Sequence, residues 1–308
     1  MSKSKLNKTI DFSIDEVGSY LDKAIYEEFL GKASIDDIIN NIIVGDFFNS
    51  IKYLPDDYFD LIIVDPPYNL RKDYHGNIFN EQKSDEYKLY TRNWIEAVKD
   101  KLKENGTIYV CCDWKSSMLI GPILAETFIL RNRITWQREK GRGSKNNWKN
   151  SMEDIWFATK SNRYTFNLDA VKQRRRVIAP YKENGKPKDW KESEEGNYRI
   201  THPSNFWDDI TIPFWSMAEN TAHPTQKPEK LMAKLILASS LENDMILDPF
   251  MGSGTTAVVC NKLNRRFIGI EQNPQYVAWA YKRLEMAQKD NSIQGYEDGV
   301  FLYRNAKI

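Results

Sequence analysis

The sequence predicts an α/β fold: a Rossmann-like, doubly wound, mostly parallel sheet with one irregular insertion. Three observations predict it. Short apolar runs alternate with helical patterns both before residue 160 and after residue 227. Residues 160–222 instead lack apolar periodicity and are rich in charged residues, Asn, Pro and Trp. The length of 308 residues suits one large α/β domain that carries such an insertion.

The first part of the chain contains the apolar run 59–65 (FDLIIVD), which predicts a buried strand that ends in an acid. Residues 87–104 have helical spacing, and Asn105-Gly106 predict the end of that helix. Nearer the N-terminus, the amphipathic stretch 17–30 predicts a short helix. The other elements expected here are a strand at 106–112, a helix at 116–130, and strands at 134–139 and 153–160.

The second part begins with a strongly helical stretch at 228–241, with Pro228 in its first turn. Asn273 is a candidate N-cap for the last helix. The other elements expected here are strands at 245–248 and 266–271 and helices at 254–263 and 274–287. Strand–helix alternation at both ends of the chain is typical of a doubly wound sheet.

The bulk composition is that of an ordinary globular protein, with 41% hydrophobic and 28% charged residues. The net charge of +1 does not by itself indicate nucleic acid. Three cysteines form no CxxC pair and three histidines lack metal-ligand spacing, so we expect neither a disulfide framework nor a metal. The sequence shows no apolar signal core and no run that could span a bilayer, so we expect a cytoplasmic enzyme without a membrane partner.

A candidate catalytic loop, Asp65-Pro66-Pro67-Tyr68, directly follows the first strand. Ligands of open α/β sheets bind beyond the carboxyl ends of the strands. Each proline keeps the residue before it extended, so the loop should rigidly present a carboxylate, the Pro66 carbonyl and an aromatic ring. Rigid acceptors of this kind suit the methylation of an aromatic amine. The lone pair of such an amine is conjugated into its ring, and hydrogen bonds to two acceptors would favour the pyramidal nitrogen that can be methylated. The Tyr68 ring is suited to stacking on a base that carries such an amine.

A second loop, residues 248–256 (DPFMGSGTT), lies between a strand and a helix. Its glycines let the backbone turn tightly and approach a ligand. Glu271 ends the next strand, where an acid is placed to bind ribose hydroxyls. The pattern also fits the dinucleotide fingerprint, so this loop alone does not separate NAD from S-adenosylmethionine. A phosphate-binding P-loop is disfavoured, because no Lys follows the glycines.

Together the two loops resemble the β-class DNA amino-methyltransferases, in which the catalytic segment precedes the cofactor segment. The resemblance covers roughly residues 40–287. Asp46 is similar to the family's acid that meets the cofactor adenine. The segment HPTQKP at 223–228 is similar to the one that holds the methionine end of the cofactor, and Glu271 matches the ribose-binding acid.

The resemblance implies direct methyl transfer from S-adenosylmethionine to adenine N6 of a base flipped out of the duplex. The implied catalytic residues are Asp65, Pro66, Pro67 and Tyr68. The implied cofactor-binding residues are Asp46, Asp65, Thr225, Gln226, Lys227, Asp248, Pro249, Phe250, Gly252, Ser253, Gly254, Thr255 and Glu271. No Pro-Cys dipeptide is present, so the nucleophile of cytosine-ring methyltransferases is missing, and Cys111-Cys112 is more typical of core.

The resemblance also divides the chain into four regions. They are a helical lead-in at 1–40, the catalytic half of the methyltransferase domain at 41–159, the target-recognition region at 160–222 and the cofactor-binding half at 223–308. The target-recognition region offers Arg, Lys, Asn and Gln side chains that suit base edges. The recognition sequence itself depends on docking geometry and cannot be deduced from these residues.

Basic residues cluster at 131–149, within the catalytic half, and at 172–176, shortly after it. Such residues contact phosphates and position a duplex without determining its sequence, which indicates double-stranded DNA as the partner. The expected DNA-binding residues are Arg138, Lys140, Arg142, Lys145, Lys149, Lys172, Arg174, Arg175 and Arg176.

Several alternatives remain open. An N4-cytosine DNA methyltransferase would use nearly the same chemistry, although that group more often has Ser in place of Asp65. RNA or protein amine methyltransferases usually have Asn there and place the cofactor loop first. An NAD-dependent dehydrogenase would explain the glycine loop but not Asp-Pro-Pro-Tyr, and a non-enzymatic DNA-binding protein would need no acceptor loop. The resemblance leaves a homodimer and a cognate restriction endonuclease open as partners.

Overall fold

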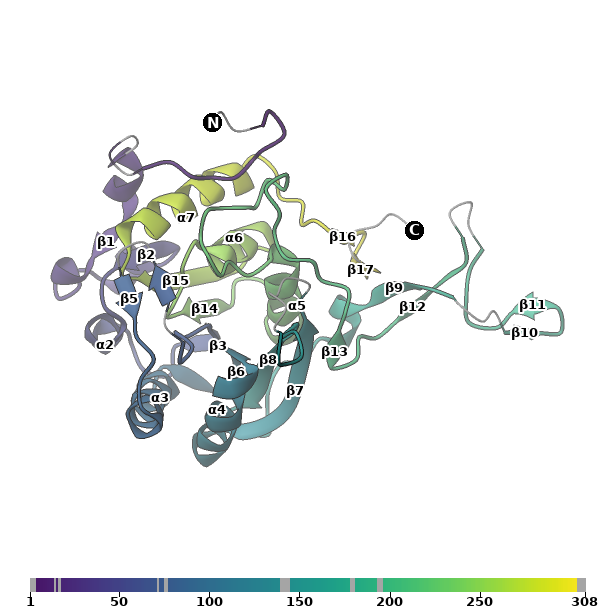
Figure 1. The fold of residues 1–308 in the computed structure, drawn as a ribbon, viewed down its shortest axis with the longest axis horizontal. Coiled ribbons are helices and arrows are strands. Elements are labelled where there is room, and N and C mark those ends of the chain that lie inside the picture. The colour runs from purple at the N-terminus through teal and green to yellow at the C-terminus, as the bar shows by residue number, and fades with distance from the viewer. Residues whose placement is uncertain are drawn as a thin grey trace.

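The structure is a computed structural model that describes residues 4–13, 15, 18–70, 72–74, 77–138, 145–177, 181–192 and 196–303. Within this part of the chain, nine strands form one sheet in the order β1-β2-β15-β14-β3-β6-β8-β7-β13 (Figure 1). The strands are Ile25–Tyr26 (β1), Asn41–Val44 (β2), Phe59–Val64 (β3), Leu102–Asp113 (β6), Ile129–Gln137 (β7), Met152–Thr159 (β8), Phe206–Trp207 (β13), Met245–Asp248 (β14) and Arg266–Glu271 (β15). Only the two pairs made by β8 are antiparallel among these described strands, so the predicted doubly wound, mostly parallel sheet is confirmed.

Helices cover both faces of the sheet (Figure 1). Successive residues of β3 enter different cores, because side chains alternate along a strand: Leu61 and Ile63 lie in one core, Ile62 and Val64 in the other. The first core is closed by Glu229–Ser239 (α5), Thr255–Lys262 (α6) and Pro274–Ala287 (α7). The second is closed by Ile35–Ile38 (α1), Phe47–Ser50 (α2), Ser84–Lys99 (α3) and Trp114–Thr127 (α4). Burial on both faces explains why the strands of the sheet centre are continuous apolar runs.

Local signals at the helix ends acted as expected in the second part of the chain. The Asn273 side chain caps α7 by accepting a hydrogen bond from the backbone N–H of Gln275, as predicted. Pro228 occupies the N-cap position of α5, so this helix begins one residue later than the sequence indicated. Both helices start at the sheet edge where the candidate site lies.

Two predicted helices are corrected by the structure. The stretch 17–30 forms a 3-10 turn at Gly18–Lys23 (η1), strand β1 and a second 3-10 turn at Glu27–Phe29 (η2), because β1 pairs with β2 at the sheet edge. The helix expected at 87–104 ends at Lys99, since Leu102 already pairs with Phe59. Asn105-Gly106 therefore lie in an irregularity of β6 and are not a helix stop. In both cases strand pairing outweighed the local helical pattern.

The insertion is more ordered than predicted. Its strands Gln173–Arg176 (β9) and Tyr198–Thr201 (β12) form a four-stranded sheet, within the described residues, with Tyr296–Glu297 (β16) and Val300–Leu302 (β17). Between β9 and β12 the chain extends away from the main body and ends in the hairpin of Lys182–Glu183 (β10) and Lys186–Pro187 (β11) (Figure 1). The remaining elements are 3-10 turns at Ile51–Tyr53 (η3) and Leu168–Val171 (η4) and a hairpin of Lys72–Tyr74 (β4) and Asn77–Phe79 (β5). Among the described helices, none combines the length and the apolarity needed to cross a membrane.

Candidate active site

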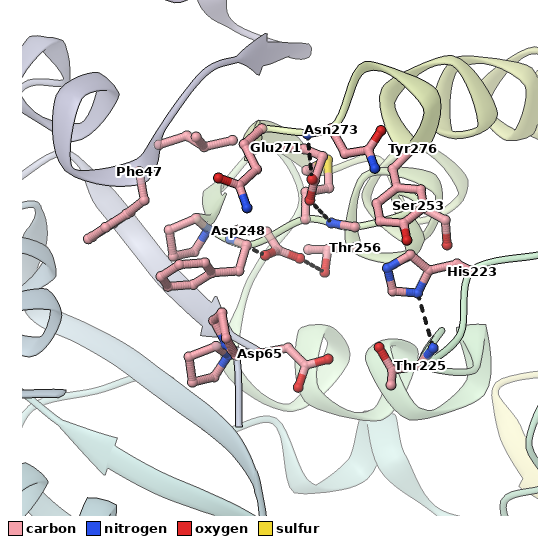
Figure 2. Close-up of a pocket in the computed structure, with 18 of the residues that line it drawn as sticks. Phe47, Asp65, His223, Thr225, Asp248, Ser253, Thr256, Glu271, Asn273 and Tyr276 are labelled. Atoms are coloured by element: carbon pink, nitrogen blue, oxygen red, sulfur yellow. Dashed lines mark hydrogen bonds between the residues drawn. The ribbon is translucent and has the colours of Figure 1, made fainter. Parts of the chain in front are cut away.

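A cavity of about 270 Å³ lies beyond the carboxyl ends of β2, β3, β14 and β15 (Figure 2). This is the edge at which open α/β sheets bind ligands. The residues expected from the sequence that line it are Asp46, Asp65, Pro66, Pro67, Tyr68, Thr225, Gln226, Lys227, Asp248, Pro249, Phe250, Gly252, Ser253, Thr255 and Glu271. Gly254 is absent from this lining, although both of its chain neighbours contribute to it. The fold thus brings the two predicted loops to one cavity.

The glycine loop is held close to its neighbours at two positions. Gly254 has φ +79°, and a Cβ there would lie 2.4 Å from the Cβ of Ala280 in α7. Gly252 has φ +55°, and a Cβ there would lie 3.1 Å from the His223 ring. Positive φ and close contact both favour glycine, so these residues set the path of the loop around the cavity.

Two carboxylates, the buried Asp248 and the half-buried Glu271, occupy the side of the cavity formed by the glycine loop. Glu271 accepts hydrogen bonds of 2.8 Å from the backbone N–H groups of Gly252 and Asn273. Asp248 accepts hydrogen bonds from the Thr256 hydroxyl and the Phe250 N–H. Burial raises the pKa of Asp248 and of Glu271 to about 7, although these hydrogen bonds act in the opposite direction.

Phe47 was not singled out from the sequence, yet its ring lies beside that of Phe250 at this end of the cavity. The two ring centroids are 4.9 Å apart and the planes are inclined by 31°. Phe47 follows Asp46, whose carboxylate caps the short helix α2 by accepting from Asn49 N–H. Aromatic rings at a cavity wall provide an apolar surface for a flat ring of a ligand.

The other end of the cavity holds the Asp-Pro-Pro-Tyr loop and an ammonium group. Lys227 Nζ lies 2.6 Å from Asp65 Oδ2 and 3.4 Å from Glu153 Oε2. The Tyr68 hydroxyl donates to Asp65 Oδ1 at 2.8 Å, and Lys227 Nζ lies 3.1 Å from the same hydroxyl. The sequence assigned Lys227 to the cofactor segment, whereas in the structure its ammonium is bonded to Asp65.

Sequence reasoning missed Glu153. Its side chain is 5% exposed and it starts the buried part of β8, next to β6 in the sheet. Arg138 donates a hydrogen bond to its other carboxylate oxygen. Two adjacent acids, Glu153 and Asp154, start this apolar strand, and the sequence does not show which of them faces the site, because their neighbours depend on the strand order.

This cluster balances its charges internally. Burial lowers the pKa of Lys227, but the nearby Asp65 and Glu153 carboxylates more than offset this and raise it above its usual range. Burial raises the pKa of Tyr68 well above its usual value, and the two carboxylates raise it further. Lys227 is therefore a permanent cation, and Tyr68 a neutral hydrogen-bond donor, at neutral pH.

The remaining predicted residues of the segment 223–228 hold that segment in place. The backbone N–H of Thr225 donates to His223 Nδ1 (Figure 2). The Gln226 amide accepts from Thr221 and donates to the Glu219 carbonyl, so this side chain stabilises its own loop. Both residues nevertheless present surface to the cavity.

The two cysteines of β6 lie in the protein core. Cys111 and Cys112 are fully buried in β6, as expected for core, and burial raises the pKa of both thiols. Neither is therefore a thiolate nucleophile at neutral pH. The described residues contain no cluster of His, Cys, Asp and Glu that is arranged to hold a metal ion.

The expected DNA-binding residues fall into three groups. Lys140 and Arg142 lie outside the described residues. Lys145, Lys149 and Arg176 are exposed. The others make contacts within the protein: Arg138 with Glu153, Lys172 with Asp169, Arg175 with Asp208, and Arg174 over the Tyr198 ring.

The chain matches the family model described as DNA methylase over residues 59–282. The Type II methyltransferase M.HpaI of Haemophilus parainfluenzae is 36% identical over 259 residues, which are 83% of this chain and 76% of that protein. The DNA adenine methyltransferase YhdJ of Escherichia coli (strain K12) is 33% identical over 253 residues, which are 80% of this chain and 83% of that protein.

Two solved structures are similar in fold. The M1.HpyAVI–SAM complex has a TM-score of 0.51 and 27% sequence identity, and the match covers 79% of this chain and 98% of that one. The PvuII DNA methyltransferase (cytosine-N4-specific) has a TM-score of 0.58 over 87% of this chain and 95% of that one. At 19% identity, the second match concerns the fold alone.

Proposed function

The chain belongs to the DNA methylase family, whose members methylate DNA with S-adenosylmethionine, and we propose that its target atom is N6 of adenine. The observation that carries the proposal is the Asp65 carboxylate at the cavity wall, beside the Pro66 carbonyl and Tyr68. An exocyclic amine has hydrogens to donate, and a carboxylate and a carbonyl are both acceptors. A relative that is 33% identical carries the name DNA adenine methyltransferase, which supports the choice of base.

We propose the following placement of the cofactor. S-adenosylmethionine supplies an electrophilic methyl group on sulfur. Glu271 would accept from the ribose hydroxyls, and the Phe47 and Phe250 rings would pack on the adenine with Asp46 nearby. Thr225 and Ser253 would hold the methionine end. Buried carboxylates and an aromatic wall suit the hydroxyls and the flat ring of this cofactor.

The chemistry follows from the other end of the cavity. Asp65 and Pro66 would hold the two amine hydrogens and orient the nitrogen lone pair, while Tyr68 would stack on the base. The nitrogen becomes positive as the carbon–nitrogen bond forms and the sulfonium becomes a neutral thioether. Asp65 is placed to stabilise that charge and to accept the surplus proton. A stacked base cannot reach this buried loop, so the adenine must flip out of the duplex.

The division of the chain and the DNA contacts are part of the same proposal. Residues 160–222, with the extension between β9 and β12, would recognise the target sequence, and the halves at 41–159 and 223–308 would hold base and cofactor. Exposed Lys145, Lys149 and Arg176 would contact phosphates. A homodimer and a cognate restriction endonuclease remain predictions, and light scattering of the purified protein checks the first.

The experiment is nucleoside mass analysis of plasmid DNA incubated with the protein and S-adenosylmethionine. We expect the wild type to produce N6-methyladenine. The methylation rate of Asp65→Ala should be at least about 100-fold lower, because that variant lacks the carboxylate that stabilises the positive charge developing on the nitrogen. Calorimetric binding of S-adenosylhomocysteine should persist in the variant. Detection of N4-methylcytosine would mean that the target base is cytosine and not adenine. Normal turnover by Asp65→Ala would refute the role of this residue.

A further inference from the structure

A second hollow lies outside the cavity just described. Its lining includes the aromatic residues Trp114, Trp148 and Phe206 and the amide residues Gln137 and Asn150. All three aromatic side chains are exposed, and Trp148 is 94% exposed. A large apolar side chain that stands in solvent next to two others marks an interaction surface rather than core.

The hollow is at the same end of the strands as the catalytic loop. Trp114 directly follows β6, Gln137 ends β7, and Met152, which starts β8, pairs with Gln137. The residue after Met152 is Glu153, which is joined through Lys227 to Asp65. Two side-chain contacts therefore connect the rim of the hollow to the proposed catalytic carboxylate.

The chemistry of the lining fits nucleobases. Indole and phenyl rings stack on the faces of bases, and the amides of Gln and Asn match the paired donor and acceptor of an adenine edge. Lys149, which also lines the hollow, and Lys145 are exposed and supply positive charge for the phosphates. Asn150 Oδ1 already accepts from the Met152 N–H, but an apolar peptide surface would satisfy the rings and offer no partner to the Gln137 amide or to the two lysines.

We propose that this hollow binds DNA bases immediately beside the methylated adenine, with Trp148 stacking on one base and Gln137 contacting a base edge. The inference rests on the proposed function, because it requires DNA bound with its target base at Asp65. When the target base leaves the stack, its neighbours lose a stacking partner, and an exposed indole at this position supplies one. Trp148 thus contributes affinity, and Gln137 contributes sequence preference.

The first test compares how tightly the wild type and its variants bind a plasmid-derived duplex in the presence of S-adenosylhomocysteine. The duplex contains a site that the wild type methylates. Trp148→Ala should weaken binding by roughly 5- to 150-fold, the range measured for lost base–aromatic stacking, and lower kcat/KM in parallel. Trp148→Phe should retain most of the affinity. Phe29→Ala is the matched control, since Phe29 is 54% exposed and follows β1, which is at the other end of the strand order from β7 and β13.

The second test separates stacking from charge and from base recognition. Trp148→Ala should leave the salt dependence of binding unchanged, whereas Lys149→Ala should reduce its slope by about one. Gln137→Ala should relax the preference at one position beside the methylated adenine when methylated sites are sequenced.

The outcomes distinguish the proposed function from the proposed role of the hollow. A wild-type protein that leaves DNA unmethylated would overturn the proposed function. If the wild type methylates DNA and Trp148→Ala binds DNA with unchanged affinity, only the proposal that the hollow binds bases is overturned. Because Trp148 is exposed, its variants should have the wild-type melting temperature, and loss of binding then reflects a lost contact.

Discussion

The two ends of the central cavity hold their carboxylates in different ways. At the glycine-loop end, Asp248 and Glu271 bind backbone N–H groups and one hydroxyl, and burial raises the pKa of each to about 7. At the Asp-Pro-Pro-Tyr end, Asp65 and Glu153 share the ammonium of Lys227. The neutral donors around Asp248 and Glu271 do not offset the burial that raises these two pKa values, whereas Lys227 places a full positive charge beside Asp65 and Glu153.

The difference matches the tasks proposed for the two ends. A site for ribose hydroxyls needs acceptors that gain their donors when the cofactor binds. A site for amine methylation needs an acceptor whose charge is present before the base arrives, so that no reorganisation is needed during transfer. The four predictions that follow alter one end at a time, from the largest expected effect to the smallest.

Removing the shared cation should have the largest effect on stability. Lys227→Met takes the ammonium away from Asp65 and leaves Glu153 with Arg138 alone, and removing one partner of a buried ion pair typically costs about 3–5 kcal/mol in the free energy of unfolding. Urea unfolding at pH 8 measures this cost. The double variant Lys227→Met/Glu153→Gln should recover part of it, because one carboxylate is gone, and equal stabilities of the single and double variants would contradict the shared-cation arrangement.

At the other end, Asp248 should make the stability of the free protein depend on pH. Its pKa is raised from 3.8 to about 7 in the folded protein, so the folded state binds the proton more tightly than the unfolded state. The free energy of unfolding therefore falls as pH rises from about 4 to about 7, by a few kcal/mol at most. Asp248→Asn should abolish this contribution, and unfolding at pH 5, 6, 7 and 8 checks it. Parallel pH curves for the variant and the wild type would exclude it.

Glu271 should make cofactor affinity depend on pH. Ribose hydroxyls donate to the ionised carboxylate, so binding is strongest above pH 7 and weakens as Glu271 takes up a proton below that pH. We expect S-adenosylhomocysteine to bind up to about tenfold more weakly at pH 6 than at pH 8 in calorimetry. Glu271→Gln should bind S-adenosylhomocysteine weakly at both pH values. Asp248→Asn is the control for a contribution of the neighbouring acid to the pH dependence.

The effect expected for Tyr68→Phe is about as small as the one expected for protonation of Glu271. The variant keeps the ring for stacking and loses only the hydroxyl that donates to Asp65, so it removes one hydrogen bond worth about 1.5–3 kcal/mol to a charged group. Because Lys227 still binds Asp65, we expect kcat to fall by about tenfold and DNA affinity to stay within a few-fold of the wild type. A loss as large as that of Tyr68→Ala would mean that the hydroxyl, and not the ring, dominates.

Much of the fold and of the cavity was predictable because short motifs in the chain have a fixed place in this architecture. The apolar run 59–65 became β3, and the acids at its end and at the ends of β14 and β15 line the same cavity. The helix expected at 17–30 was wrong, because strand pairing at the sheet edge outweighed a local pattern. The insertion formed strands with the C-terminal residues, a partnership that no local pattern indicates.

The sequence by itself determined the catalytic and cofactor loops, since Asp-Pro-Pro-Tyr and the glycine loop are contiguous and stiffened by their own prolines and glycines. Only the tertiary structure decided which charges meet. Lys227 and Glu153 lie far from Asp65 in the chain, and they reach it because β8 is inserted antiparallel beside β6 and the segment before α5 crosses the end of the sheet. A buried ion pair depends on which strands are neighbours, and that order is a property of the packed sheet.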